Sequence, residues 1–183
     1  MQRDLVERAM AGDREAFTEL GRLWIDRLYA IARLILRDGD QAQDATQKAL
    51  IVAWRDIKGL RDPDRIEPWL RRLLINACYQ EARKTRRRVR AEGRVRPLAE
   101  GFPDPALASA DHDELTRAFA GLTPEQRALV VLHYYLQLPM QETALALGLP
   151  VGTVKSRLHR TTQQLRASMD AHARLPLLTE RAS

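Results

Sequence analysis

The sequence predicts an all-α protein, with two small helical domains joined by a flexible linker and a helix-turn-helix in the C-terminal domain. Apolar residues recur at spacings of three and four along most of the chain, and strand-like alternation is nearly absent. A proline-rich stretch separates two groups of helical patterns. These observations divide the chain into a domain at 1–92, a linker at 93–112, a domain at 113–170 and a tail at 171–183.

Most of the positive charge lies in one segment. Lys and Arg number 30 against 24 Asp and Glu in 183 residues, and residues 83–96 alone hold eight basic residues and one glutamate. Such a segment suits nucleic acid, an anionic membrane or an acidic partner. The single cysteine, Cys78, excludes an intrachain disulfide. No apolar run reaches the ~18 residues that span a bilayer, and the N-terminus lacks the apolar core of a signal peptide, so we expect a cytoplasmic protein.

The first domain begins with two predicted helices. The first spans 13–36, and its apolar face consists of Phe17, Leu20, Trp24, Leu28, Ile31 and Ile35. The segment "RDGD" (37–40) ends this helix with a glycine. A second helix spans 41–57, with Ala45, Ala49, Val52 and Trp54 expected to face inward.

A third helix follows the loop "KGLRDPDRIEP" (58–68), which is indicated by its glycine and prolines. The helix begins at Trp69, and its apolar stripe consists of Leu70, Leu73, Leu74, Ala77 and Cys78. Trp69 begins this stripe, so we interpret it as a core residue rather than a platform for stacking bases. We expect the helix to end within the basic run "RKTRRRVR" (83–90).

The second domain has clear signals for helix ends. Thr123 is a predicted N-cap, with Pro124 at the first helical position and Gln126 completing a capping box. The short helix "LPMQETALALG" ends at Gly148, which can adopt the left-handed conformation that closes a helix. Pro150 cannot continue that helix but suits the start of another. Two helices therefore meet at a tight turn, as in a helix-turn-helix.

The second helix of this motif has two distinct faces. Its inner face consists of Val154, Leu158, Thr161 and Leu165, and its outer face of Thr153, Ser156, Arg157 and Arg160. Arginine bonds guanine bidentately, and Ser and Thr bond bases or phosphates. Lys155 lies beside that face and suits backbone phosphate. The alternative is an amphipathic helix with a solvated basic face.

The stretch "LTPEQRALVVLHYYLQLPMQETALALGLPVGTVKSRLHRTTQQLR" closely resembles the C-terminal DNA-binding region of bacterial extracytoplasmic-function (ECF) sigma factors. That region recognises the −35 promoter element. The resemblance places Lys155, Ser156, Arg157, His159 and Arg160 on the DNA. Two departures stand out. Thr143 replaces the family's usual apolar residue and is expected to loosen the small core, and Leu145 replaces a polar one and is expected to leave an apolar spot on the surface.

The stretch "DGDQAQDATQKALIVAWRDI" resembles the family's polymerase-binding helix, and Asp44, Gln47 and Trp54 match its pattern. The resemblance implies that Asp44 and Gln47 contact core polymerase. Gln43 and Lys48 stand where acidic residues are usual, which makes the expected contact surface less acidic. A helix face with Asp and Gln offers acceptors to a basic partner, although a merely solvated face has the same composition.

The stretch "IEPWLRRLLINACYQEARKTRRR" resembles the helix that melts the promoter and recognises its −10 element. Asn76 interrupts an apolar run, and its amide can pair with a base edge; the alternative is a buried structural amide. The resemblance implies that Asn76 and Leu60 hold a base flipped out of the strand. Contacts to the phosphates of the strand being opened are expected from the basic side chains of this stretch, which are Arg71, Arg72, Arg83, Lys84, Arg86, Arg87 and Arg88.

These resemblances imply an RNA polymerase sigma factor of the ECF type, with core polymerase (β′ and β subunits) and promoter DNA as partners. Its linker is expected to run through the polymerase's RNA path. Members are often held by an anti-sigma factor, though nothing in the sequence names one. We expect no enzyme activity, cofactor, metal or membrane partner, because no nucleophile motif, phosphate loop or metal-ligand spacing occurs. The alternative is a helix-turn-helix regulator that acts without docking on polymerase.

Overall fold

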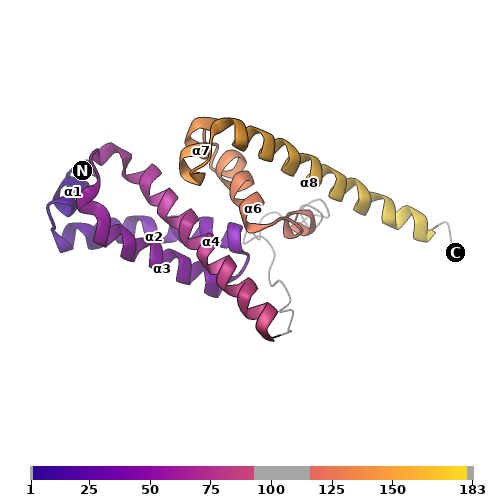
Figure 1. Ribbon diagram of the computed structural model, residues 1–183, viewed down its shortest axis with the longest axis horizontal. Coiled ribbons are helices and arrows are strands. Elements are labelled where there is room, and N and C mark those ends of the chain that lie inside the picture. Colours follow the sequence, from indigo (N-terminus) through magenta and orange to yellow (C-terminus); the bar gives the residue numbers. More distant parts are fainter. Residues whose placement is uncertain (1, 93–115, 181–183) are drawn as a thin grey trace.

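The computed structural model describes residues 2–92 and 116–180, and every regular element in these two segments is helical (Figure 1). The first domain contains α1 (Gln2–Met10), α2 (Arg14–Leu36), α3 (Gly39–Asp56) and α4 (Ile66–Glu92), with short 3₁₀ turns at Ile57–Gly59 and Pro63–Arg65. The second contains α6 (Pro124–Val130), a π-helical turn at Val131–Tyr135, α7 (Met140–Leu147) and α8 (Val151–Glu180). Residues 116–120 are also helical. The predicted linker at 93–112 lies outside the described residues.

Polar residues define the ends of the long helices in the first domain. The Asp13 carboxylate accepts hydrogen bonds from the backbone N–H groups of Glu15 and Ala16, at 2.9 and 3.1 Å, and so caps α2. At the other end of α2, Arg37 has a left-handed backbone with φ 58°, and its N–H donates to the Arg33 carbonyl. Asp38 then caps α3. The break predicted between these two helices is therefore confirmed, but the glycine does not end α2: Arg37 does, and Gly39 is the first residue of α3.

The fourth helix is longer than the sequence pattern suggested. We expected it to end in the basic run at 83–90, but α4 continues unbroken to Glu92. The apolar stripe stops there, yet Arg and Lys are good helix formers, and the preceding turns are anchored by packing. The run therefore presents its basic side chains from a rigid helix. A helix at the N-terminus, α1, was not predicted and packs against α2.

The predicted helix signals of the second domain are confirmed. Thr123 accepts a hydrogen bond from the N–H of Gln126, whose side chain in turn accepts from the Thr123 N–H, so the capping box is complete. A small core holds the helix-turn-helix together and consists of Leu129, Ala144, Val154 and Leu158. The last helix continues past residue 170, to Glu180.

The two domains pack directly on each other. Helix α7 lies on α4, and α6 contacts both α4 and the end of α2 (Figure 1). One continuous apolar cluster runs from the first domain into the second, where its members are Phe119, Leu122, Ala128, Val131, Leu132, Leu138 and Ala146. Within residues 2–92 and 116–180, we find no helix with both the length and the apolar character needed to cross a bilayer.

Candidate nucleic-acid and polymerase interfaces

The helix-turn-helix depends on a tight turn at residues 148–150. Gly148 ends α7 with φ 64°, a conformation that costs glycine little. Its N–H donates to the carbonyls of Ala144 and Leu145, and the N–H of Leu149 donates to Ala144 at 3.0 Å. These bonds satisfy carbonyls at the end of α7 and direct the chain into α8.

Helix α8 has the two faces that its sequence predicts. Val154, Leu158 and Thr161 are 0%, 6% and 1% exposed and pack inward. Thr153 is half-buried, and the exposed side chains on the opposite side are those of Lys155, Ser156, Arg157, His159 and Arg160. This arrangement presents a row of hydrogen-bond donors to a partner outside the protein.

The charge of this face suits an anionic partner. Residues 151–169 contain no acidic side chain. The contacts within the face are local: the Ser156 hydroxyl donates to the Thr153 carbonyl at 3.0 Å, and Arg160 Nε donates to the Ser156 carbonyl at a long 3.4 Å. The second of these is weak, so Arg160 loses little by turning to an outside acceptor.

The two departures from the family pattern lie on α7, away from this outer face of α8. Thr143 is fully buried, and its hydroxyl donates to the Pro139 carbonyl at 3.1 Å, so the core accommodates its polarity. Leu145 is 58% exposed, which confirms the apolar spot expected on the surface.

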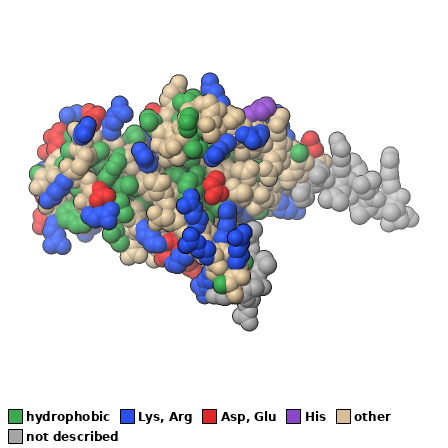
Figure 2. All heavy atoms as spheres, viewed as in Figure 1, with side chains coloured by type: hydrophobic (Ala, Val, Ile, Leu, Met, Phe, Trp, Pro, Cys, Tyr) green, Lys and Arg blue, Asp and Glu red, His purple; other side chains and the backbone are tan. Residues whose placement is uncertain are grey.

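Helix α4 carries the candidate −10 residues on its exposed side. Asn76 is exposed, whereas its neighbours Ile75 and Ala77 are buried. Of the two roles left open for Asn76, the buried structural amide is therefore excluded. The side chains of Arg83, Lys84 and Arg87 are exposed further along the helix. Lys and Arg gather over this C-terminal part of α4 (Figure 2).

Leu60 and Trp69 lie closer to the core. Leu60 follows the first 3₁₀ turn, is 9% exposed and belongs to the apolar cluster of the first domain. Only a small part of its side chain is therefore available to a base. Trp69 is half-buried and packs against the same cluster, as predicted.

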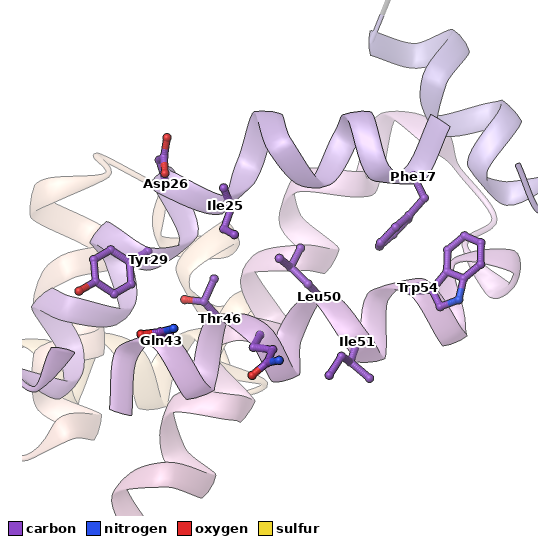
Figure 3. A pocket seen from close by; sticks show the side chains of 10 residues that line it. Phe17, Ile25, Asp26, Tyr29, Gln43, Thr46, Leu50, Ile51 and Trp54 are labelled. Carbon is purple, nitrogen blue, oxygen red and sulfur yellow. The ribbon is translucent and has the colours of Figure 1, made fainter. Parts of the chain in front are cut away.

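The predicted polymerase-binding helix, α3, borders an apolar groove. The groove lies between α2 and α3 and has a volume of about 710 Å³ (Figure 3). Its lining residues are Phe17, Ile25, Asp26, Tyr29, Gln43, Thr46, Gln47, Leu50, Ile51 and Trp54. The rings of Phe17 and Trp54 lie 5.0 Å apart at one end. Trp54 was expected to face inward, but it is 37% exposed and lines this groove instead. Asp44 is exposed on α3 but does not line the groove.

The α2 side of this groove was not predicted. Ile25 and Tyr29 are 45% and 39% exposed, and Ile51 on α3 is 59% exposed. The sequence did contain a signal for this side of the groove, because Ile25 and Tyr29 stand four residues apart, beside the main apolar stripe of α2. That spacing places two exposed apolar side chains on a second face of the helix.

Lys48 makes a contact that the sequence did not predict. It stands where an acidic residue is usual in the family pattern, and its ammonium pairs with the carboxylate of Glu81 on α4. Glu81 is 2% exposed and also lies 3.6 Å from Lys84. The charge of Lys48 is therefore engaged between α3 and α4.

Comparisons with known proteins agree with this arrangement. Residues 22–88 match the family "Sigma-70 region 2", and residues 112–165 match "Sigma-70, region 4". The ECF RNA polymerase sigma factor SigM of Mycobacterium tuberculosis is 34% identical over 164 residues, which cover 88% of this chain and 81% of SigM. The RNA polymerase sigma-E factor of Streptomyces coelicolor is 35% identical over 163 residues, covering 87% of this chain and 89% of that protein.

Two solved structures are also similar to this chain. The sigma factor RpoE of Bartonella quintana, in a complex with the anti-sigma factor NepR, matches with a TM-score of 0.69 and 26% identity over 84% of this chain and 96% of that one. CnrH, in a complex with the cytosolic domain of CnrY, matches with a TM-score of 0.65 and 26% identity over 93% and 97%. A helix-turn-helix regulator without polymerase docking is not favoured, because the first domain matches region 2. The chain belongs to the ECF family of RNA polymerase sigma factors.

Proposed function

We propose that this sigma factor docks on core RNA polymerase through the groove between α2 and α3 and recognises its promoter with α4 and α8. The observation that carries the proposal is the groove itself. It combines exposed apolar side chains with the amide of Gln47, next to the exposed Asp44. Apolar surface of this kind, bordered by polar groups, is typical of a protein-docking site.

In this proposal, the polymerase covers Ile51 and Trp54, which are 59% and 37% exposed in the free chain. Asp44 and Gln47 then accept hydrogen bonds from basic or amide groups of the polymerase. Burial of the apolar side chains supplies affinity, and the polar pair sets the register of docking.

The −35 element is assigned to the start of α8. Arg157 and Arg160 would contact base edges in the major groove, together with Thr153, Ser156 and His159, because arginine matches the acceptors of guanine bidentately. Lys155 would contact phosphate. These side chains, exposed except for the half-buried Thr153, come from a rigid helix whose inner face is packed, which lowers the entropic cost of binding.

The −10 element is assigned to α4. Asn76 would pair with one base flipped out of the strand, with the exposed edge of Leu60 beside it. Unstacking that base costs a few kcal/mol, and the pocket contacts must offset this cost. Arg83, Lys84 and Arg87 would contact the phosphates of the opened strand, which adds affinity without base preference.

The protein itself would catalyse no reaction: the polymerase performs the chemistry, in the cytoplasm, and this chain supplies promoter recognition. We also propose that an anti-sigma factor regulates it. RpoE of Bartonella quintana has been solved in a complex with the anti-sigma factor NepR. A partner that covers the groove between α2 and α3 would compete with polymerase.

Retention on core polymerase tests the docking proposal. Asp44→Arg and Gln47→Trp should each reduce retention about tenfold or more, because one reverses a charge and the other obstructs the groove. Asp170→Arg is the matched control, since it reverses an exposed charge on α8. Circular dichroism should give the same helix content for all variants.

Unchanged retention of both groove variants would remove this surface from the polymerase interface. Transcription of a genomic library by core polymerase plus this chain would then show which promoters it selects. If core polymerase with the wild-type chain transcribed no promoter beyond those used by core alone, the assignment of α4 and α8 to promoter elements would be contradicted.

A further inference from the structure

The loop that carries Leu60 has little regular structure of its own. It runs from Ile57 to Arg65, between α3 and α4, and contains the two short 3₁₀ turns. Within it, the Leu60 N–H donates to the Ile57 carbonyl and the Arg65 N–H donates to the Asp62 carbonyl, each at 3.0 Å. Single turns of this kind are among the less stable parts of a fold unless other elements pack on them. The position of Leu60 therefore depends on what contacts the loop.

Helix α1 lies along this loop. It contacts both 3₁₀ turns as well as α2, and it lies beside the turn that leads into α4 (Figure 1). The side chains of Leu5, Val6 and Ala9 are buried and belong to the same apolar cluster as Leu60. The match to region 2 begins only at residue 22, so it assigns no role to α1.

An ion pair joins the start of α1 to the second 3₁₀ turn. Nη1 of Arg3 donates to Oδ2 of Asp64 at 2.6 Å, and Nε of Arg3 donates to Oε1 of Glu7, one turn further along α1, at 3.0 Å. The Asp64 N–H in turn donates to the Asp62 carboxylate at 3.0 Å. Both partners are therefore oriented by bonds within their own segments. The side chains of Arg3 and Asp64 are 61% and 64% exposed, so the pair adds little to the stability of the domain, but it fixes where a short loop lies.

The other end of α1 meets the first 3₁₀ turn. Gly12 has φ 99°, and its N–H donates to the Ala9 carbonyl at 3.0 Å, which closes the helix. The Lys58 side chain lies against this glycine, because a methyl group at Gly12 would lie 3.3 Å from Lys58 Nζ. An ammonium there complements the negative end of the α1 dipole. Helix α1 thus contacts the loop on both sides of Leu60, at Lys58 and at Asp64.

We propose that α1 positions this loop for recognition of the −10 element, with Arg3 as the main positioning residue. The inference rests on the proposed function, in which Leu60 and Asn76 hold one flipped base. A pocket for a single base tolerates little displacement, because a wall that is about 1 Å out of place already weakens specific contacts. Loss of the contact from Arg3 lowers discrimination at one base, and leaves the general affinity for DNA to the basic side chains of α4.

The competing role for Arg3 is a direct contact with a promoter phosphate. The two roles differ in the effect of Asp64→Asn. If Arg3 contacts phosphate, Asp64→Asn frees the arginine and removes a negative charge near the DNA, so binding should strengthen. If Arg3 positions the loop, Asp64→Asn and Arg3→Gln break the same ion pair and should act in the same direction. These two variants change the net charge with opposite signs, so a shared effect does not come from charge.

Hydrogen exchange of the full-length chain measures how firmly the loop is fixed. Arg3→Gln and Asp64→Asn should each speed exchange of the backbone amides at 57–65 about two- to fivefold, which is the range expected for one exposed ion pair. The double variant R3Q/D64N should exchange no faster than either single variant, because the pair is lost only once. Arg3→Lys can keep the pair and should stay close to the wild type.

The matched control is Arg22→Gln, which removes an exposed arginine from α2 with the same change of charge. Its exchange at 57–65 should match that of the wild type, and thermal melting should show that every variant is folded. If neither Arg3→Gln nor Asp64→Asn speeds exchange at 57–65, the inference is overturned whatever DNA binding shows.

Binding of single-stranded −10 oligonucleotides to core polymerase with the full-length chain measures the consequence. The oligonucleotides carry each of the four bases at each position, and Asn76→Ala identifies the position of the flipped base. Arg3→Gln and Asp64→Asn should each lower the preference at that position about two- to fivefold and leave the other positions unchanged. Arg3→Lys should restore most of the preference.

Three results of this binding experiment would overturn the inference. They are a uniform loss at every position, opposite effects of Arg3→Gln and Asp64→Asn, and a preference like that of Arg22→Gln. If the two variants loosen the loop but Asn76→Ala alters the preference at no position, the proposed capture of a flipped base fails. The positioning of the loop by α1 then stands, because hydrogen exchange measures it without DNA.

Discussion

The ammonium of Lys48 in α3 pairs with the carboxylate of Glu81 in α4, which is 2% exposed. A second polar contact joins the same two helices, from the Thr85 hydroxyl to the Gln41 side-chain oxygen at 3.0 Å. The helix assigned to polymerase docking is therefore tied to the helix assigned to the −10 element. Lys48, which departs from the family pattern, makes one of these two contacts between the helices.

Replacing Lys48 should destabilise the first domain. Lys48→Met leaves a buried carboxylate with only the more distant Lys84, and should lower the free energy of unfolding by about 2–3 kcal/mol. Lys48→Glu, which restores the family's usual residue, should cost more, because two carboxylates would then lie together. Urea denaturation followed by circular dichroism measures both. The exchanged pair K48E/E81K should recover part of the loss, and a Lys48→Glu variant as stable as the wild type would contradict the pairing.

Truncating the arginines of α8 should change promoter choice. Arg157→Ala or Arg160→Ala should each cost about 1–3 kcal/mol of discrimination at one −35 position, because a bidentate contact to a base is lost. Transcription from promoters that carry every single-base change in the −35 element measures it. Lys155→Ala is the comparison, since the loss of a phosphate contact should weaken all these promoters alike. If both arginine variants keep the wild-type preference, the base-reading face lies elsewhere.

Replacing Asn76 and replacing Arg87 should impair promoter binding in different ways. Asn76→Ala should alter preference at a single −10 position, since one specific amide contact disappears. Arg87→Ala should weaken binding uniformly and flatten its salt dependence. Testing all four bases at each −10 position with both variants separates the two patterns. A uniform loss for Asn76→Ala would remove its assigned contact with the flipped base.

Stability should fall in alkaline solution because of Cys78. Burial raises the pKa of its thiol from 9.0 to about 12. Between these values the unfolded chain loses the proton and the folded chain keeps it. The contribution of the buried Cys78 thiol to the free energy of unfolding is therefore complete below pH 9. It is lost as the pH rises toward 12, by up to about 1.4 kcal/mol per pH unit. Urea denaturation at pH 8–10.5 should show a steeper decline for the wild type than for Cys78→Ala, and equal slopes would refute the shift.

The sequence by itself determined the features that depend on near neighbours along the chain. The spacing of apolar residues, the capping box at Thr123 and the break at Gly148 identified the helices and the turn between α7 and α8. The same periodicity placed Arg157 and Arg160 on the outer face of α8. These features are set by backbone geometry and by contacts three or four residues apart, which any stretch of sequence displays.

The tertiary structure decided what depends on residues far apart in the chain. Lys48 meets Glu81 only because α3 packs on α4, and Ile25 faces Ile51 across a groove only because α2 lies beside α3. Arg127 reads in the sequence as one more surface charge, yet it is buried against the end of α2, 92 residues earlier. Its place follows from the docking of two domains. The free energy of that docking comes from many distant pairs at once, so no local pattern records it.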